Sequence, residues 1–114
     1  MQESYQLFLD DIRDVPMVYP RLTNDDFVIV RTYEAFIDYI QKHGLPSFIS
    51  FDNDLGTDQE GNLLADGYAA AKWLVHESHL DLENLKFNVH SANPVASIQI
   101  KSLLSNFIQF LKKT

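Results

Sequence analysis

Four short apolar runs recur along the chain, and their spacing limits the folds open to it more than any other feature. The runs are residues 7–9, 27–30, 48–51 and 87–89. Each is nearly continuous rather than alternating, which is typical of strands buried on both faces of a parallel sheet. The chain therefore predicts four parallel strands whose connecting segments cross over the faces of the sheet.

Three segments beside these runs carry helical periodicity. The first helix is expected to begin after Thr32, a suitable cap, and to end at Gly44. The second is expected to begin near Asp66 or Gly67, and the third after Asn93. The apolar residues that share one face of each helix, and are therefore expected in the core, are Tyr33, Phe36, Ile37, Ile40, Tyr68, Ala71, Leu74, Val75, Ile100, Leu103, Leu104, Phe107, Ile108 and Leu111.

The alternation of strands and helices predicts βαβ units with right-handed crossovers. We expect a three-layer, flavodoxin-like α/β fold in which four parallel strands in the order 2-1-3-4 carry helices on both faces. Residues 12–26 are long enough for a crossover but have no periodicity, so we expect a loop with at most a short helical turn. The length of 114 residues fits one domain over residues 1–114.

The composition excludes several classes of protein. The chain has no cysteine, which removes thiol chemistry and disulfides and favours a reducing, cytoplasmic location. Its formal net charge is −7, and an acidic surface repels duplex nucleic acid. We also expect no membrane segment, because no apolar stretch reaches the roughly 20 residues of a span, and no signal peptide, because a basic start is lacking.

Acidic residues follow the first and third apolar runs. Strand order reverses between these two strands, and ligands of such sheets bind beyond the strand ends at the reversal. Three carboxylates there, Asp10, Asp11 and Asp52, would repel one another unless a cation lay between them. Oxygen ligands select a hard cation, Mg²⁺, Mn²⁺ or Ca²⁺, over zinc, and of these we expect Mg²⁺ or Mn²⁺. Asp54 is either a further ligand or a turn residue ahead of Gly56.

Four more side chains at the same edge suit a phosphate ligand. Arg13 and Arg31 are either a phosphate clamp or structural ion pairs with the aspartates. Ser91 precedes the last helix, whose free N–H groups attract anions, and it either binds phosphate or caps that helix. His90 is either a general acid or base or a core residue, because neighbours along a strand face opposite sides.

The order of these residues resembles the receiver domains of two-component signalling. In receivers, an acidic pair after the first strand binds Mg²⁺, and Asp10 and Asp11 match it. Asp52 matches the aspartate that accepts a phosphoryl group, and Ser91 matches the hydroxyl residue after the fourth strand. Receivers also have a fifth strand ending in a lysine, and here the last long helix is followed by no such strand.

A truncated relative, the cyclic-phosphate-processing receiver-like domain family, is a closer resemblance. Its members carry phrases similar to LFLDDIR, VRTYEAF, GLPSFISFDNDLG, GYAAAKWLV and VHSANP, in this order. Together these phrases cover most of the chain, although the family often has a histidine at the position of Asn53. The resemblance implies processing of 2′,3′-cyclic phosphate ends in RNA repair.

Three functions are compatible with these residues. The first is a metal-dependent phosphoesterase that acts on a cyclic phosphate, either a small phosphate ester or an RNA terminus, with Asp52, His90 and Ser91 as its catalytic residues. In it Asp52 either attacks phosphorus or only binds the metal. The second is a signalling module phosphorylated on Asp52. The third is a non-catalytic domain that binds metal or a partner, to which Trp73 would contribute if exposed.

Overall fold

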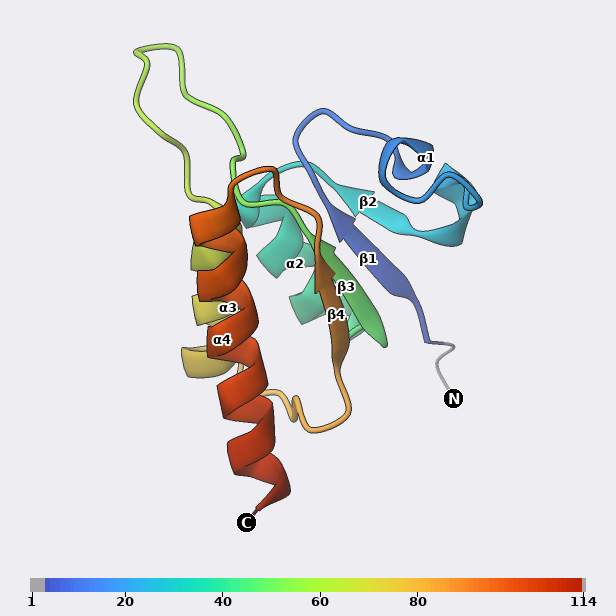
Figure 1. The fold of residues 1–114 in the computed structure, drawn as a ribbon, viewed down its shortest axis with the longest axis vertical. Coiled ribbons are helices and arrows are strands. Elements are labelled where there is room, and N and C mark those ends of the chain that lie inside the picture. Colours follow the sequence, from blue (N-terminus) through green and yellow to red (C-terminus); the bar gives the residue numbers. More distant parts are fainter. Residues whose placement is uncertain (1–3, 114) are drawn as a thin grey trace.

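Four parallel strands form the sheet of this protein. The structure is a computed structural model that describes residues 4–113; residues 1–3 and 114 of the expected domain lie outside that range. In the sheet, β1 (Gln6–Leu9), β2 (Val28–Val30), β3 (Phe48–Phe51) and β4 (Lys86–Val89) lie in the order β2-β1-β3-β4, all parallel (Figure 1). The predicted strand order is confirmed, and the strand bounds agree to within one residue.

The three long helices pack together against one face of the sheet. They are α2 (Tyr33–His43), α3 (Gly67–His76) and α4 (Pro94–Lys112). Every helix residue predicted for the core either belongs to a single buried cluster with the strands or packs against that cluster. Trp73 is also part of this cluster, with 7% of its surface exposed, so it is not available to a partner.

The opposite face of the sheet is covered by the β1–β2 crossover. This segment holds the four-residue helix α1 (Val15–Val18) and a 3-10 turn at Asn24–Asp26, so the predicted loop is present but carries two short helical turns where at most one was expected. Phe8, Val15 and Phe27 form a small second core there. The predicted three layers are therefore present, but one outer layer is three long helices and the other is a single short one (Figure 1).

The long helices begin where their caps predict. Thr32 accepts a hydrogen bond from the Ala35 N–H at 3.1 Å, and Asp66 accepts one from the Ala69 N–H at 2.8 Å. Asn93 does the same for the first turn of α4. Each side chain satisfies a backbone donor that has no partner inside its helix.

Gly67 allows α3 to begin directly against the end of β3. A Cβ atom at this position would lie 1.9 Å from the carbonyl oxygen of Asp52, so a side chain cannot be accommodated without moving the backbone. Asn53 fixes the same junction, because its carbonyl accepts from the Gly67 N–H at 2.8 Å and its side-chain oxygen from the Tyr68 N–H at 3.1 Å. The start of α3 thus sets the position of the backbone at Asp52.

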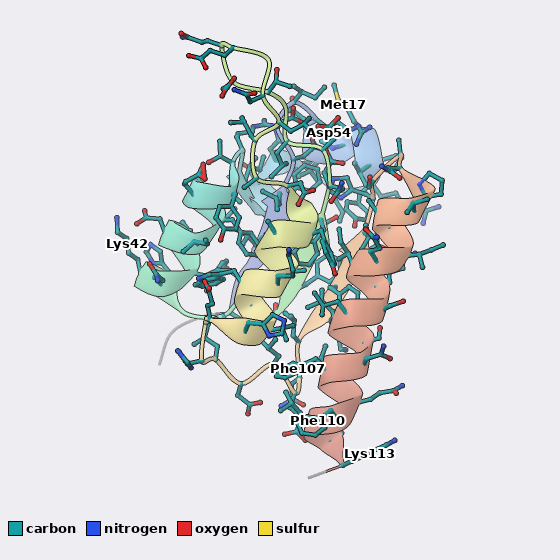
Figure 2. All side chains as sticks on the ribbon, turned by 90° about the vertical axis from the view of Figure 1, so that its left-hand side faces the viewer. Met17, Lys42, Asp54, Phe107, Phe110 and Lys113 are labelled. Atoms are coloured by element: carbon teal, nitrogen blue, oxygen red, sulfur yellow. The ribbon has the colours of Figure 1, made fainter. Side chains whose placement is uncertain are left out.

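The strands finish at one end of the molecule, away from the end of α4. Met17 and Asp54 lie at the first end in Figure 2, and Phe110 and Lys113 lie at the other. Among residues 4–113, no helix combines the length and the apolar character that crossing a membrane requires.

Candidate metal and phosphate site

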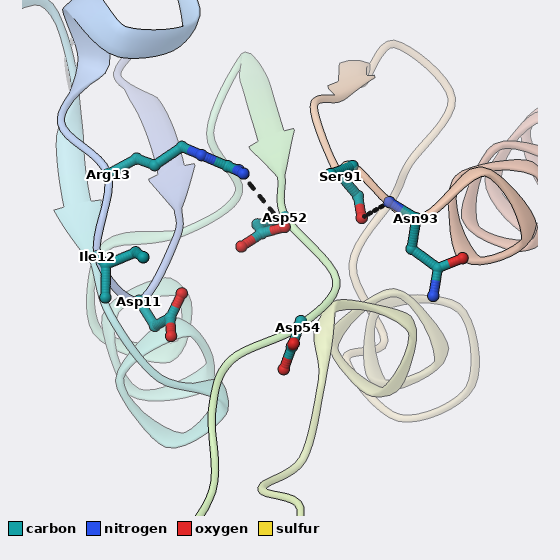
Figure 3. A pocket seen from close by; sticks show the side chains of 8 residues that line it. Asp11, Ile12, Arg13, Asp52, Asp54, Ser91 and Asn93 are labelled. Atoms are coloured by element: carbon teal, nitrogen blue, oxygen red, sulfur yellow. Dashed lines mark hydrogen bonds and ion pairs between the residues drawn. The ribbon is translucent and has the colours of Figure 1, made fainter.

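An open cleft of about 400 Å³ lies beyond the carboxyl ends of β1, β3 and β4. Its position is the predicted one, where strand order reverses between β1 and β3. In Figure 3, acidic side chains and Arg13 occupy one side of the cleft, and the start of α4 occupies the other. The lining residues are Asp11, Ile12, Arg13, Asp52, Asp54, Ser91, Ala92 and Asn93.

Three carboxylates cluster at the base of this cleft, where Asp11 and Asp52 line it and the fully buried Asp10 lies behind them. Asp10, Asp11 and Asp52 each offer an oxygen atom, and these atoms all lie within 4.8 Å of one another. Burial and the negative charges of Asp10 and Asp11 raise the pKa of Asp52 to about 6. Closely spaced carboxylate oxygens are the donor set that Mg²⁺ and Mn²⁺ prefer, so the cluster is able to hold a hard divalent cation.

Asp10 is the most firmly held of the three. One carboxylate oxygen accepts from the backbone N–H groups of Ile12 and Arg13, and the other accepts from Arg13 Nη1 and His90 Nε2. Burial alone would raise the pKa of this carboxyl, but the hydrogen bonds from Arg13, Ile12 and His90 lower it below its ordinary value. Asp10 is therefore ionised and fixed in orientation before any ligand arrives.

His90 lies behind Asp10 and does not line the cleft. Its Nε2 is 2.9 Å from Asp10 Oδ2, its Nδ1 is 2.6 Å from Ser50 Oγ, and its ring stacks on Phe8 at 4.8 Å. Burial lowers the pKa of His90, so the ring is neutral at pH 7. Both nitrogens are occupied and the side chain is 3% exposed, so we revise its expected role from proton donor to support for Asp10.

The two arginines at this edge are placed differently. Arg13 Nη1 lies 3.3 Å from Asp10 Oδ2 and 3.9 Å from Asp52 Oδ1, and the side chain is one-third exposed at the cleft. Arg31 does not line the cleft. Its guanidinium donates to the carbonyl oxygens of Asp10 and Arg13 and to the carboxylate of Asp14, which is not one of the clustered aspartates, so its role is structural but its ion-pair partner differs from the expected one. Of the two, only Arg13 is placed to contact a ligand in this cleft.

Ser91 and Asp54 complete the polar lining. Ser91 Oγ accepts from the Asn93 N–H at 3.1 Å, which leaves its hydroxyl hydrogen able to point into the cleft. Asp54 accepts from the Gly56 N–H at 3.2 Å, so it forms the expected turn and lines the cleft as well. It is not among the three clustered carboxylates.

Some residues that shape the site were not predicted from the sequence. Ser50 touches His90, and Tyr19 touches Ser50 from the crossover. Ser50 carried a signal that could have been used, because a serine inside the apolar run Phe48–Phe51 needs a buried partner. Tyr19 carried none, since residues 12–26 have no periodicity to indicate which side chains face inward.

The family comparison bears directly on this cleft. The model of the cyclic-phosphate processing receiver domain matches residues 5–106. The chain belongs to this family. The match includes the three clustered carboxylates, Arg13 and Ser91, and it agrees with the four-stranded, receiver-like sheet.

As a member of the cyclic-phosphate processing receiver family, the chain also shares its fold with a solved structure. That structure is described as the yeast Spc42 trimeric coiled coil, amino acids 181–211, fused to another protein. The two are 17% identical with a TM-score of 0.55, over 97% of this chain and 79% of that one, which shows the fold alone. No curated protein matches the chain.

Proposed function

We propose that this receiver-like domain is a metal-dependent phosphoesterase that opens a cyclic phosphate, with a 2′,3′-cyclic phosphate at an RNA end as the candidate substrate. The observation that carries the proposal is the cleft itself. It places a cation-binding carboxylate cluster, an exposed arginine and a serine hydroxyl within one space. Membership of a family associated with cyclic-phosphate processing selects this chemistry among those the cleft allows.

Each side chain of the cleft has a distinct part in this proposal. Asp11 and Asp52, with Asp10 behind them, would hold the cation, which when bound supplies positive charge to the phosphate and activates water. Arg13 donates to non-bridging phosphate oxygens, as guanidinium groups do in phosphate sites. The hydroxyl of Ser91 donates to another oxygen from the opposite wall. The substrate phosphate is thereby held between the two walls of the cleft.

Asp52 has two possible parts within this reaction. It is either a metal ligand or the nucleophile that attacks phosphorus and is later released by hydrolysis. Either role requires the ionised carboxylate, and the proton competes with the cation for it, so the affinity for Mg²⁺ is expected to fall as the pH drops below the Asp52 pKa of about 6 in the metal-free protein. Substitution of Asp52 should abolish turnover in both cases.

The deciding experiment uses a short RNA that ends in a 2′,3′-cyclic phosphate, incubated with the protein and Mg²⁺ or Mn²⁺. Wild type should open the ring and Asp52→Asn should not. Asp38→Asn is the matched control, because Asp38 is an exposed acid of α2 paired with Lys42, outside the cleft. Failure of wild type to open the ring with either ion would reject the proposed function.

A signalling module is the second candidate, because Asp52 opens onto the cleft beside Arg13 as a phosphate acceptor would. Incubation with acetyl phosphate and Mg²⁺ distinguishes the two. A stable phosphoryl adduct on Asp52, with no ring opening of the RNA, would favour signalling.

A further inference from the structure

A continuous row of hydrogen bonds runs behind the cleft, on the α1 side of the sheet. Asn88 Nδ2 lies 2.9 Å from the Tyr19 hydroxyl, which lies 2.6 Å from Ser50 Oγ. Ser50 Oγ lies 2.6 Å from His90 Nδ1, and His90 Nε2 lies 2.9 Å from Asp10 Oδ2. The row therefore links β4, the β1–β2 crossover and β3 to a carboxylate of the metal cluster.

The chemistry of the two ends gives the row a single direction. Asp10 receives only N–H donors, so its carboxylate accepts and the proton of His90 lies on Nε2. At the other end the Asn88 amide donates to the Tyr19 oxygen, which leaves the tyrosine hydrogen for Ser50. Ser50 then donates to His90 Nδ1. In the reverse direction the Tyr19 hydrogen would have no acceptor among the hydrogen bonds of residues 4–113.

The Asp10 carboxylate depends on the last bond of this row. Its Oδ1 is held by backbone donors, whereas its Oδ2 is held by His90 and by Arg13. Arg13 is one-third exposed and would turn toward a phosphate, but His90 is buried and its ring lies within 6° of parallel to Phe8. His90 is thus the side chain that keeps Oδ2 in place when a ligand enters.

We propose that Ser50, supported by Tyr19, is a positioning residue that fixes the ring of His90 through Nδ1 and thereby holds Asp10 in the orientation the cation site needs. This inference rests on the proposed metal site. Without the Ser50 hydroxyl, His90 Nδ1 loses its donor in a fully buried position. The proton stays on Nε2, because the Asp10 carboxylate can only accept, but the ring has lost one of its two hydrogen bonds and holds Asp10 Oδ2 less firmly.

Two substitutions test the row at different points. Ser50→Ala should weaken Mg²⁺ binding about tenfold, the lower end of what loss of a ligand's supporting hydrogen bond costs. Tyr19→Phe keeps the ring and removes only the hydroxyl, so it should fold normally and weaken Mg²⁺ binding by a smaller factor, about threefold. It also keeps the inference testable if Ser50→Ala is poorly folded.

Matched controls lie elsewhere on the sheet. Ser47→Ala removes a hydroxyl just before the start of β3, where Ser47 donates to the Tyr5 carbonyl at 3.2 Å. Tyr5→Phe removes a hydroxyl that donates to the Gly44 carbonyl at 2.5 Å. Both should leave Mg²⁺ affinity unchanged, even where they lower stability.

The decisive readout is the ¹⁵N spectrum of the histidines in metal-free protein, combined with calorimetric titration of Mg²⁺. His90 should carry its proton on Nε2 in wild type and in Ser50→Ala, but in Ser50→Ala this proton should exchange faster with solvent and Mg²⁺ binding should be weaker. An unchanged exchange rate, an unchanged affinity, or an equal loss in the controls would overturn the inference.

A wild type that binds neither Mg²⁺ nor Mn²⁺ is a different outcome, because it overturns the proposed function. The histidine spectrum of the metal-free protein then decides the Ser50 inference alone. An unchanged exchange rate of the His90 Nε2 proton in Ser50→Ala would overturn that inference too, and faster exchange would uphold the positioning of His90 by Ser50.

Discussion

On the face of the sheet covered by α2, α3 and α4, the strands contribute Leu7, Leu9 and other apolar side chains to one large core. On the other face, beside the small core around Phe8, Ser50 of β3 and Asn88 of β4 both form hydrogen bonds with the Tyr19 hydroxyl, and Ser50 also bonds to His90, which directly follows β4. Alternate residues of one strand therefore do different work. The apolar face supplies stability, and the polar face positions the carboxylates, so the two can be damaged separately.

Gly67→Ala should lower the stability of the fold and displace the carboxylates of the cation site together, and it has the largest expected effect. A Cβ atom there would lie 1.9 Å from the Asp52 carbonyl oxygen, so α3 must move away from β3. We expect a loss of about 3 kcal/mol or more in the free energy of unfolding, the upper range for overpacking, together with loss of Mg²⁺ binding. Denaturant titration and calorimetry measure the two quantities.

The matched control is Gly61→Ala. Unlike Gly67, Gly61 has a positive φ, +85°, and nothing lies within 4 Å of its added Cβ atom. This variant should lose only about 1 kcal/mol, from backbone conformation, and keep its Mg²⁺ affinity. Equal losses in the two variants would refute the importance of the close approach.

Leu104→Ala should damage the apolar face alone. Leu104 lies on the inner face of α4 and is fully buried in the core. Its replacement by alanine leaves a cavity that lowers the free energy of unfolding by about 3 kcal/mol. Mg²⁺ affinity at a temperature where the variant is folded should match wild type, whereas Tyr19→Phe should show the opposite pattern. A large fall in Mg²⁺ affinity in Leu104→Ala would show that the two faces are not separable.

Asp52→Asn should stabilise the metal-free protein at neutral pH. The pKa of Asp52 rises from 3.8 to about 6 on folding, mainly through burial, so the folded protein binds this proton more tightly than the unfolded chain. The stability that this contributes is fully present below pH 3.8 and is lost as the pH rises through about 6. The asparagine carries no such penalty, which alone is worth about 3 kcal/mol at neutral pH. Because it also loses the ion pair with Arg13, we expect a net gain of about 2 kcal/mol.

The pH dependence supplies the control for this prediction. The advantage of Asp52→Asn over wild type should shrink as the pH falls below about 6, and it should also shrink when Mg²⁺ is added to wild type. Asp38→Asn should show neither change. An advantage that stays constant from acid to neutral pH would contradict the assignment.

His79→Gly has the smallest expected effect. His79 follows α3 with φ at +58°, a conformation that glycine adopts more easily than other residues. Stability should rise by about 0.5 kcal/mol with no change in Mg²⁺ affinity, because this turn lies at the end of α3 farthest from Asp52. A loss of stability would mean that the histidine side chain makes a contact worth more than the backbone strain.

Much of this arrangement follows from the sequence, for physical reasons. Apolar continuity defined the strands, helical periodicity with Thr32 and Asn93 as caps defined the helices, and the strand order located the carboxylates. His90 and Arg31 could not be decided, because both alternatives depended on the direction of a side chain at a strand end. The row through Tyr19 depends on contacts between distant segments, which no local pattern records.

The close approach at Gly67 also affects how mutational data on this protein would read. Position 67 has no side chain and contacts no substrate in the proposed reaction, yet any larger residue there displaces the Asp52 backbone. A saturation scan selected on activity would rank it beside Asp10 and Asp52. Intolerance to substitution would then make Gly67 resemble a catalytic or metal-binding residue. A parallel scan that measures the amount of folded protein would be needed to recognise that its role is steric.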